Sequence, residues 1–230
     1  MRSHRAFTGQ LKEALAGLGR AEGDIRAVLL THGHPDHTGL TGPLGRAGAD
    51  IWIHERDAAV LRDGPRSATR HAKPERSMVP YLLRRPSGLA VLLHMARSGA
   101  FTASGTTEAR VFASGTTEAR VFDTDRRLDE VPGAPRAVTL PGHTPGSTGY
   151  LFPERGLLFT GDALVTGDGL SGRTGPTLVC RAFTHDSRAA LAALDRLDEL
   201  TADVLLPGHG EPFTDGVRAA TALARQAGVR

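Results

Sequence analysis

Apolar and polar positions along the chain predict short buried strands mixed with amphipathic helices. Short apolar runs between turn residues predict strands at 27–31, 50–53, 136–140, 148–152, 157–160 and 203–206. Apolar residues at helical spacing predict helices at 11–18, 56–61, 78–84, 89–97, 188–200 and 215–226. Strands and helices mixed in this way favour an α/β fold in which helices cover layers of sheet.

Two segments interrupt this pattern. Residues 62–105 are long, basic and proline-containing, and we interpret them as a helical insertion or lid, because uncommitted loops of this length are rare in compact domains. The decapeptide ASGTTEARVF occurs twice in tandem, at 103–112 and 113–122. One repetition of so short a period does not make a solenoid, so the repeat predicts a loop or strand extended by duplication.

The composition is that of an ordinary globular protein. Hydrophobic residues make up 40% of the 230 residues and charged residues 23%, which fits a single domain over 1–230 and excludes a disordered or fibrous chain. The longest apolar stretch, 88–95, is too short to span a bilayer, and the first residues do not resemble a signal peptide. The single cysteine, Cys180, cannot form an internal disulfide, so we expect a cytoplasmic protein with no membrane partner.

The charge is modest and scattered. The formal net charge is +3, and only two of the 28 basic residues are lysines. The densest basic pairs are Arg84–Arg85 and Arg126–Arg127, and no basic stripe follows a helix or a loop. A nucleic-acid groove usually needs such a stripe, so we expect a small-molecule substrate and no nucleic-acid partner.

The strongest chemical signal is the segment THGHPDH, directly after the predicted strand at 27–31. It places His32, His34, Asp36 and His37 within six residues of one another. Imidazole nitrogens and carboxylate oxygens are ligands that zinc and similar divalent metals prefer. Alternation at the strand end lets His32 and His34 point to one side, while Asp36 and His37 face a second position after the turn.

Three other strand ends carry one ligand-type side chain each, next to glycine. They are His143 in PGHTPGS, Asp162 in LLFTGDAL and His209 in VLLPGHGEP. Functional groups displayed at strand ends on a rigid scaffold are what a metal site needs. Seven such residues are too many for one tetrahedral zinc ion and suit two ions.

At these residues the sequence resembles the metallo-β-lactamase superfamily, whose fold is a four-layer αβ/βα sandwich. The motif at 32–37 and the three later residues match the superfamily's motifs in order, and the likeness runs from about residue 11 to residue 230. The resemblance implies two sets of ligands. His32, His34 and His143 would hold one metal, Asp36, His37 and His209 the second, and Asp162 would bridge both.

The resemblance also implies an activity. Asp162 resembles the aspartate of the glyoxalase II, lactonase and ribonuclease Z branches, and β-lactamases of the superfamily usually lack it. We therefore expect a dinuclear hydrolase of a small ester, thioester or lactone that uses a hydroxide bridging two zinc ions, with iron or manganese as other options. Asp36 would orient the hydroxide and return a proton.

Two alternatives stay open at this stage. A persulfide dioxygenase with a single iron resembles the same motifs and would be an oxidoreductase. The other alternative is a truncated chain that binds metal without catalysis. Superfamily members normally begin with two or three strands, whereas this sequence begins close to the first helix. We therefore expect an N-terminally truncated sandwich with an exposed sheet edge that could support homo-oligomers.

Other candidate side chains are given structural interpretations. His54 precedes a predicted helix, and His71, His94 and His185 have no motif partner. Cys180 has no neighbouring base, which predicts a small buried apolar role.

Overall fold

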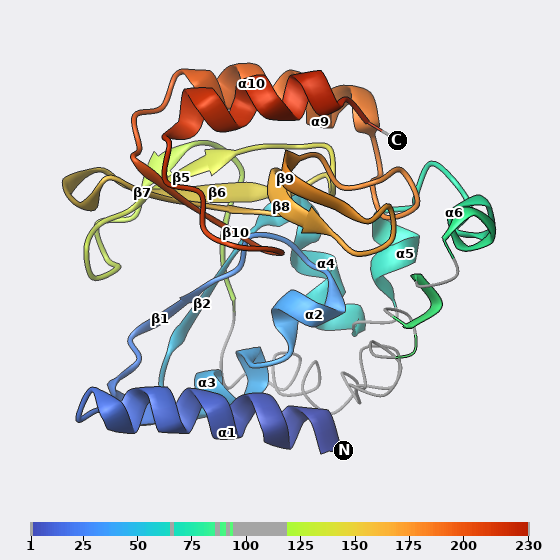
Figure 1. The fold of residues 1–230 in the computed structure, drawn as a ribbon. Coiled ribbons are helices and arrows are strands. Elements are labelled where there is room, and N and C mark those ends of the chain that lie inside the picture. Colours follow the sequence, from blue (N-terminus) through green and yellow to red (C-terminus); the bar gives the residue numbers. More distant parts are fainter. Residues whose placement is uncertain (1, 65–66, 86–87, 91–92, 94–118, 230) are drawn as a thin grey trace.

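The computed structural model describes residues 2–64, 67–85, 88–90, 93 and 119–229, which form two main sheets and a separate β-hairpin between outer layers of helices (Figure 1). Helices α1 (Arg2–Gly17), α3 (Thr41–Arg46) and α4 (Glu55–Asp63) lie on the side of the smaller sheet. Helices α9 (Ser187–Asp198) and α10 (Val217–Ala227) cover the larger sheet. The order helix, sheet, sheet, helix confirms the predicted α/β sandwich of four layers.

The smaller sheet is parallel, with the order β1 (Ala27–Leu29), β2 (Asp50–His54) and β3 (Arg120–Phe122). The short 3-10 helix η1 (Glu22–Asp24) precedes β1. Side chains alternate between the two faces of β2, so Trp52 packs towards the larger sheet while Ile51 and Ile53 pack in a separate cluster with Leu61 of α4. Among the described residues, no strand pairs with the outer edge of β1.

The larger sheet has the order β10-β7-β6-β5-β4. Its strands are β4 (Arg126–Arg127), β5 (Arg136–Thr139), β6 (Thr148–Phe152), β7 (Leu157–Gly161) and β10 (Val204–Pro207). The pairs β4–β5, β5–β6 and β6–β7 are antiparallel, and η3 (Pro153–Arg155) joins β6 to β7. Strand β10 is parallel to β7, so the carboxyl ends of these two strands meet at the same edge.

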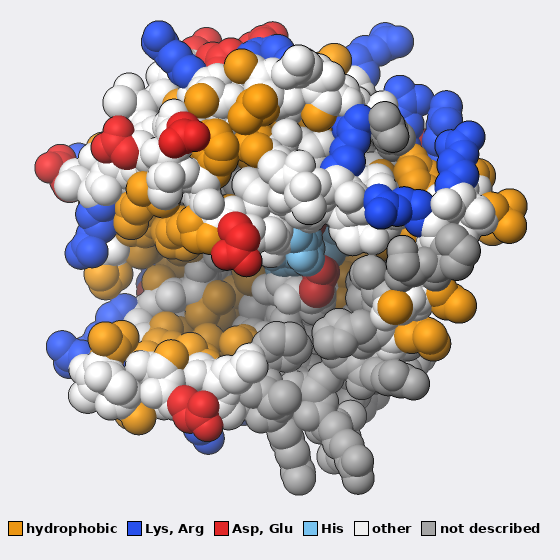
Figure 2. Space-filling view, in the orientation of Figure 1, with side chains coloured by type: hydrophobic (Ala, Val, Ile, Leu, Met, Phe, Trp, Pro, Cys, Tyr) orange, Lys and Arg blue, Asp and Glu red, His pale blue; other side chains and the backbone are white. Residues whose placement is uncertain are grey.

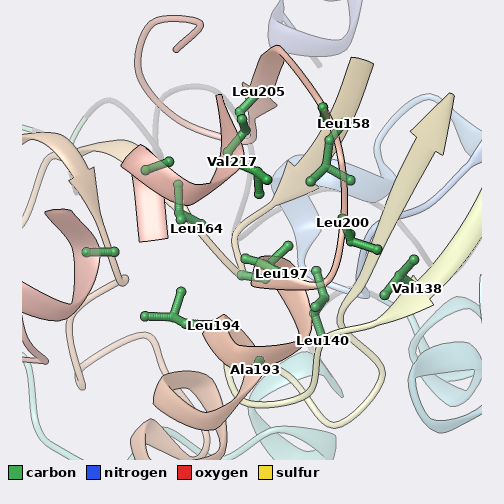
Figure 3. Close-up of a cluster of buried hydrophobic side chains, with 14 of the residues drawn as sticks. Val138, Leu140, Leu158, Leu164, Ala193, Leu194, Leu197, Leu200, Leu205 and Val217 are labelled. Carbon is green, nitrogen blue, oxygen red and sulfur yellow. The ribbon is translucent and has the colours of Figure 1, made fainter. Parts of the chain in front are cut away.

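The largest apolar core lies between this sheet and the two C-terminal helices (Figure 3). Leu194 and Leu197 of α9 are fully buried against Leu158 and Leu205 of the sheet. The Asp186 side chain caps α9 by accepting a hydrogen bond from the backbone of Ala189 at 2.9 Å. This core fixes the two neighbouring strands β7 and β10. No helix among the described residues is long and apolar enough to cross a bilayer.

The sequence pattern did not predict the hairpin of β8 (Val165–Asp168) and β9 (Arg173–Thr177). The segment is rich in glycine and lacks the apolar alternation of a half-buried strand. The buried carboxylate of Asp168 holds it, accepting hydrogen bonds from the backbone of Leu170, Ser171 and Cys180. Cys180 is buried as expected, and burial raises the pKa of its thiol to about 12.

The predicted insertion at 62–105 contains the short helices α5 (Ala68–His71) and α6 (Val79–Arg84) and helical residues at 88–90. Most of the predicted helix at 89–97 lies outside the described residues, so the role of this segment as a lid stays a prediction. The first decapeptide and most of the second also lie outside them. The last three residues of the second copy form β3, which agrees with the prediction of a loop or strand at this repeat.

Candidate metal centre

The seven predicted ligand residues lie together where loops from both sheets meet. His32 and His34 follow β1, and His143 lies in the loop between β5 and β6. Asp162 directly follows β7, and His209 follows its parallel neighbour β10. The remaining two, Asp36 and His37, lie in α2 (Pro35–Thr38).

The turn from β1 into α2 separates the first motif into two parts. His34 has extended backbone angles and precedes α2, and Pro35 occupies the first helical position, where no backbone N–H is needed. The backbone N–H of His37 donates to the carbonyl of His34 at 3.1 Å, which folds the chain back. Along the chain, His32 and His34 therefore precede the helical turn of α2, while Asp36 and His37 belong to it.

Two glycines allow the strand ends of the larger sheet to approach the first motif. Gly161 has a φ of 52° and a Cβ there would lie 2.5 Å from the Thr31 side chain. A Cβ on Gly208 would lie 2.1 Å from a carboxylate oxygen of Asp162 and 2.8 Å from the ring of His37. The space beside Asp162 therefore has no room for any larger residue at position 208.

Asp162 lies at the centre of the cluster. One carboxylate oxygen, Oδ2, lies 3.4 Å from Nε2 of His143, 3.3 Å from Nε2 of His209 and 3.8 Å from Nε2 of His32. The other, Oδ1, lies 3.5 Å from Nε2 of His37. A single carboxylate thus faces four imidazole rings that come from three separate loops and one helix.

The ligand atoms form compact groups in which all atoms lie within 4.8 Å of one another. The groups are His32, His34 and His143; His32, His37 and Asp162; and Asp36, His37 and His209. The first and third coincide with the two sets that the family resemblance implies. In the first, Nδ1 of His34 and Nε2 of His143 are 2.8 Å apart, and in the third Oδ2 of Asp36 lies 3.3 Å from Nε2 of His209.

The buried polar atoms at the centre fit divalent cations. Nε2 of His32, Nε2 of His37 and Oδ1 of Asp162 are buried and have no hydrogen-bond partner. Burying such atoms without a partner costs about 1–3 kcal/mol each. A cation that accepts two imidazole nitrogens and a carboxylate oxygen would satisfy all three, and this donor set suits zinc and iron.

The protonation of the buried set also fits a metal. Burial lowers the pKa of His32 well below its usual value and that of His143 to about 3, so both imidazoles are neutral at pH 7. Burial alone would raise the pKa of Asp162, but His37, His209 and His143 lower it well below its usual value. Neutral imidazole and ionised carboxylate are the forms that bind metal.

His209 differs from the other histidines. Its ring lies between the carboxylates of Asp162 and Asp36, and these two bonds raise its pKa from 6.5 to about 10. In the metal-free protein His209 is therefore protonated at neutral pH, and a metal ion has to displace this proton.

We therefore expect the ion on the His209 side to bind more tightly as the pH rises towards 10. One displaced proton corresponds to about a tenfold gain in affinity per pH unit while His209 is protonated. Zinc titrations with a competing chelator between pH 7 and pH 9 measure this slope. His209→Gln should flatten it, because glutamine has no proton to lose, and an equal slope in both proteins would contradict the assignment.

A family model decides the relationship to known proteins. Residues 4–209 match the model of the metallo-beta-lactamase superfamily. The chain belongs to this superfamily. The match covers all seven clustered residues, including His209 at its last position.

One curated protein and two solved structures to which the chain is similar share about a quarter of their aligned residues with it. The hydroxyacylglutathione hydrolase GloC of Haemophilus influenzae is 24% identical over 211 residues, which cover 90% of this chain and 79% of that protein. The structure of the metallo-beta-lactamase family protein TTHA1429 from Thermus thermophilus is similar with a TM-score of 0.59 and 27% identity, covering 97% of this chain and 67% of that one. TTHA1623 in a di-iron-bound form gives a TM-score of 0.54 and 24% identity, covering 92% of this chain and 82% of that one.

Three further histidines that the structure describes, His54, His71 and His185, lie outside the cluster. Nδ1 of His54 accepts a hydrogen bond from the backbone of Arg56 and so caps α4, the structural role expected for it. His71 pairs with Asp63 at 2.9 Å on the surface, and Nδ1 of His185 faces the carbonyl of Lys73 at 3.0 Å. His94 lies outside the described residues.

Asp57 is a buried residue of the site that the sequence pattern does not single out. This buried carboxylate contacts the loops of His32 and His143, yet it lies 24 residues from the first contact and 87 from the second. It stands in the first turn of α4, where an acidic residue needs no special explanation. No local signal in the sequence distinguishes it from an ordinary helix-start aspartate.

Proposed function

We propose that this protein is a metal-dependent hydrolase that holds two divalent cations, expected to be zinc, and acts on a small ester, thioester or lactone. The observation that carries the proposal is the position of Asp162, whose carboxylate faces histidines of both ligand sets within 3.8 Å. A carboxylate shared by two sets suits two neighbouring cations better than one. The similarity to a protein named hydroxyacylglutathione hydrolase supports the hydrolytic class.

Each cation would have a distinct set of ligands. His32, His34 and His143 would hold the first, Asp36, His37 and His209 the second, and Asp162 both. Such ions polarise a carbonyl oxygen and lower the pKa of bound water to about 7. The first set is largely buried, whereas Asp36 and His209 are exposed, so substrate would approach from their side. Figure 2 shows histidine side chains with acidic neighbours at the surface in the middle of one face.

Asp36 is suited to move a proton in this site. Its carboxylate is partly exposed, and contacts with His209 and His37 lower its pKa against the opposing effect of burial. An ionised carboxylate at this place can accept a proton from the attacking water and return it to the leaving oxygen or sulfur.

Metal content and substrate turnover together test the proposal. We expect about two metal ions per chain after loading and desalting, and about one in His37→Ala. Elemental analysis should include iron and manganese, because a protein of the same fold, TTHA1623, is described in a di-iron-bound form. The loaded protein should hydrolyse at least one member of an ester, thioester and lactone panel.

Two results would contradict this proposal. One iron per chain, with oxygen consumed in the presence of a persulfide, would favour the dioxygenase instead. Metal loading without hydrolysis of any of the three substrate classes would favour a metal-binding chain that is not a hydrolase.

A further inference from the structure

Asp57 links two loops that contribute ligands to the same proposed metal. It is the third residue of α4 and its side chain is buried, with 3% exposure. Oδ2 accepts a hydrogen bond from the backbone N–H of Gly33 at 2.9 Å and from the hydroxyl of Thr144 at 2.6 Å. Oδ1 accepts one from the backbone N–H of Gly146 at 2.8 Å. All three partners donate, so the carboxylate is suited to this place and a neutral amide is not.

The donors lie next to ligand residues. Gly33 separates His32 from His34, and Thr144 directly follows His143. The first loop leaves the smaller sheet at the end of β1, while the second connects β5 and β6 of the larger sheet. The carboxylate of Asp57 therefore ties together two loops that belong to different layers of the sandwich.

The fit around Asp57 is tight. A Cβ on Gly146 would lie 2.7 Å from the carboxylate carbon of Asp57. A Cβ on Gly33 would lie 3.1 Å from the side chain of Val60, also in α4. Both loops thus approach the start of α4 as closely as their backbones allow, and a longer acidic side chain would push them apart.

We propose that Asp57 is a positioning residue that sets the geometry of the site formed by His32, His34 and His143. This inference rests on the proposed function, because it assigns Asp57 a role toward the first cation. Zinc needs its imidazole ligands at about 2.0–2.1 Å, so a small relative shift of the two loops degrades the site. The site of Asp36, His37 and His209 lacks a ligand from the His143 loop and should depend on Asp57 much less.

Asp57→Asn replaces one accepting oxygen by an amide group that donates, so at least one of the three donors loses its acceptor. Thr144→Val is the milder second variant, since it removes one donor and keeps both backbone contacts. Asp63→Asn is the matched control, because Asp63 lies at the other end of α4, is partly exposed and contacts Arg62 and His71.

The experiment measures the affinity of each zinc-binding step by competition with a chelator, and the melting temperature of the metal-free protein by circular dichroism. His34→Ala and His209→Ala identify which step belongs to which ligand set. We expect Asp57→Asn to weaken the step of the three-histidine set by about 10–100-fold and the other step less than about threefold. Thr144→Val should weaken zinc binding at the same step by a smaller factor. Asp63→Asn should leave the zinc affinity of both steps unchanged.

Other outcomes would overturn the inference. Asp57 would be a structural residue only if Asp57→Asn lowered the zinc affinity of both steps equally and also lowered the melting temperature of the metal-free protein. If Asp57→Asn leaves the zinc affinity of both binding steps unchanged, Asp57 has no role toward the metal, and the proposed function stays intact. Failure of the unaltered protein to bind zinc, iron or manganese would refute the proposed function and this inference together. If Asp57→Asn does not fold, the zinc affinities of the two binding steps in Thr144→Val test the inference by the same criteria.

Discussion

Asp162→Ala should reduce hydrolysis by several orders of magnitude and lower the metal content from about two ions per chain to one or fewer. Asp162 faces His143, His209, His32 and His37 within 3.8 Å, so its removal affects both ligand sets. The substitution also deletes the negative charge between two cations, whose repulsion is then poorly compensated. Because positioned metal ions supply most of the rate in such sites, the loss should exceed that from any single histidine.

The choice of control for this variant depends on the tertiary structure. Asp168 lies six positions further along the chain and would serve by sequence alone, but it is buried and holds the β8–β9 hairpin and the backbone of Cys180. Asp129 is the better control, since its side chain is 76% exposed and pairs with Arg127. Asp129→Ala should keep two metals and full activity. If Asp162→Ala also keeps both, the assignment of this residue is wrong.

Removal of the metals should abolish hydrolysis and lower the melting temperature by roughly 10 °C for each ion lost, without unfolding the protein. An ion present at about a thousand times its dissociation constant stabilises the folded state by about 4 kcal/mol, and in a domain of this size each kcal/mol shifts the melting temperature by about 2–4 °C. The fold should persist, because the main core of Leu194, Leu197 and Leu205 lies beneath α9 and α10, apart from the ligand residues.

Dialysis against a chelator, followed by circular dichroism and thermal melting, tests this expectation. The far-ultraviolet spectrum should stay unchanged while the melting temperature falls, and zinc, iron or manganese added singly should show which ion restores hydrolysis. Full hydrolysis by protein with no measurable metal would contradict the metal-dependent mechanism. The His37→Ala variant, which keeps the three-histidine set, should lose less thermal stability on chelation than the unaltered protein.

Much of the fold follows from local sequence patterns. Leu194 and Leu197 recur at helical spacing after the capping residue Asp186, and the structure has α9 at that place. The apolar runs before His32, Asp162 and His209 predicted β1, β7 and β10, whose bounds differ by at most two residues. These features depend on side-chain periodicity and on turn residues nearby, so the sequence contains them directly.

The candidate site was predictable as a set of residues for a related reason. His32, His34, Asp36 and His37 are adjacent in sequence, and a strand end displays its side chains whatever the rest of the fold does. The assignment of these and the later residues to two metals came from the resemblance to the superfamily. Spacing alone gave no distances between His143, Asp162 and His209.

The tertiary structure decided three further features. Strand β3 forms because residues 120–122 of the repeat lie beside β2, and the hairpin of β8 and β9 forms around the buried carboxylate of Asp168. The carboxylate of Asp57 joins the loops of His32 and His143 across 24 and 87 residues. Each of these contacts depends on how separate layers pack, and packing between distant segments leaves no periodic pattern in the local sequence. For that reason the sequence by itself determined the elements and the ligand types, while the structure determined their distances, their protonation and the residue that holds them in position.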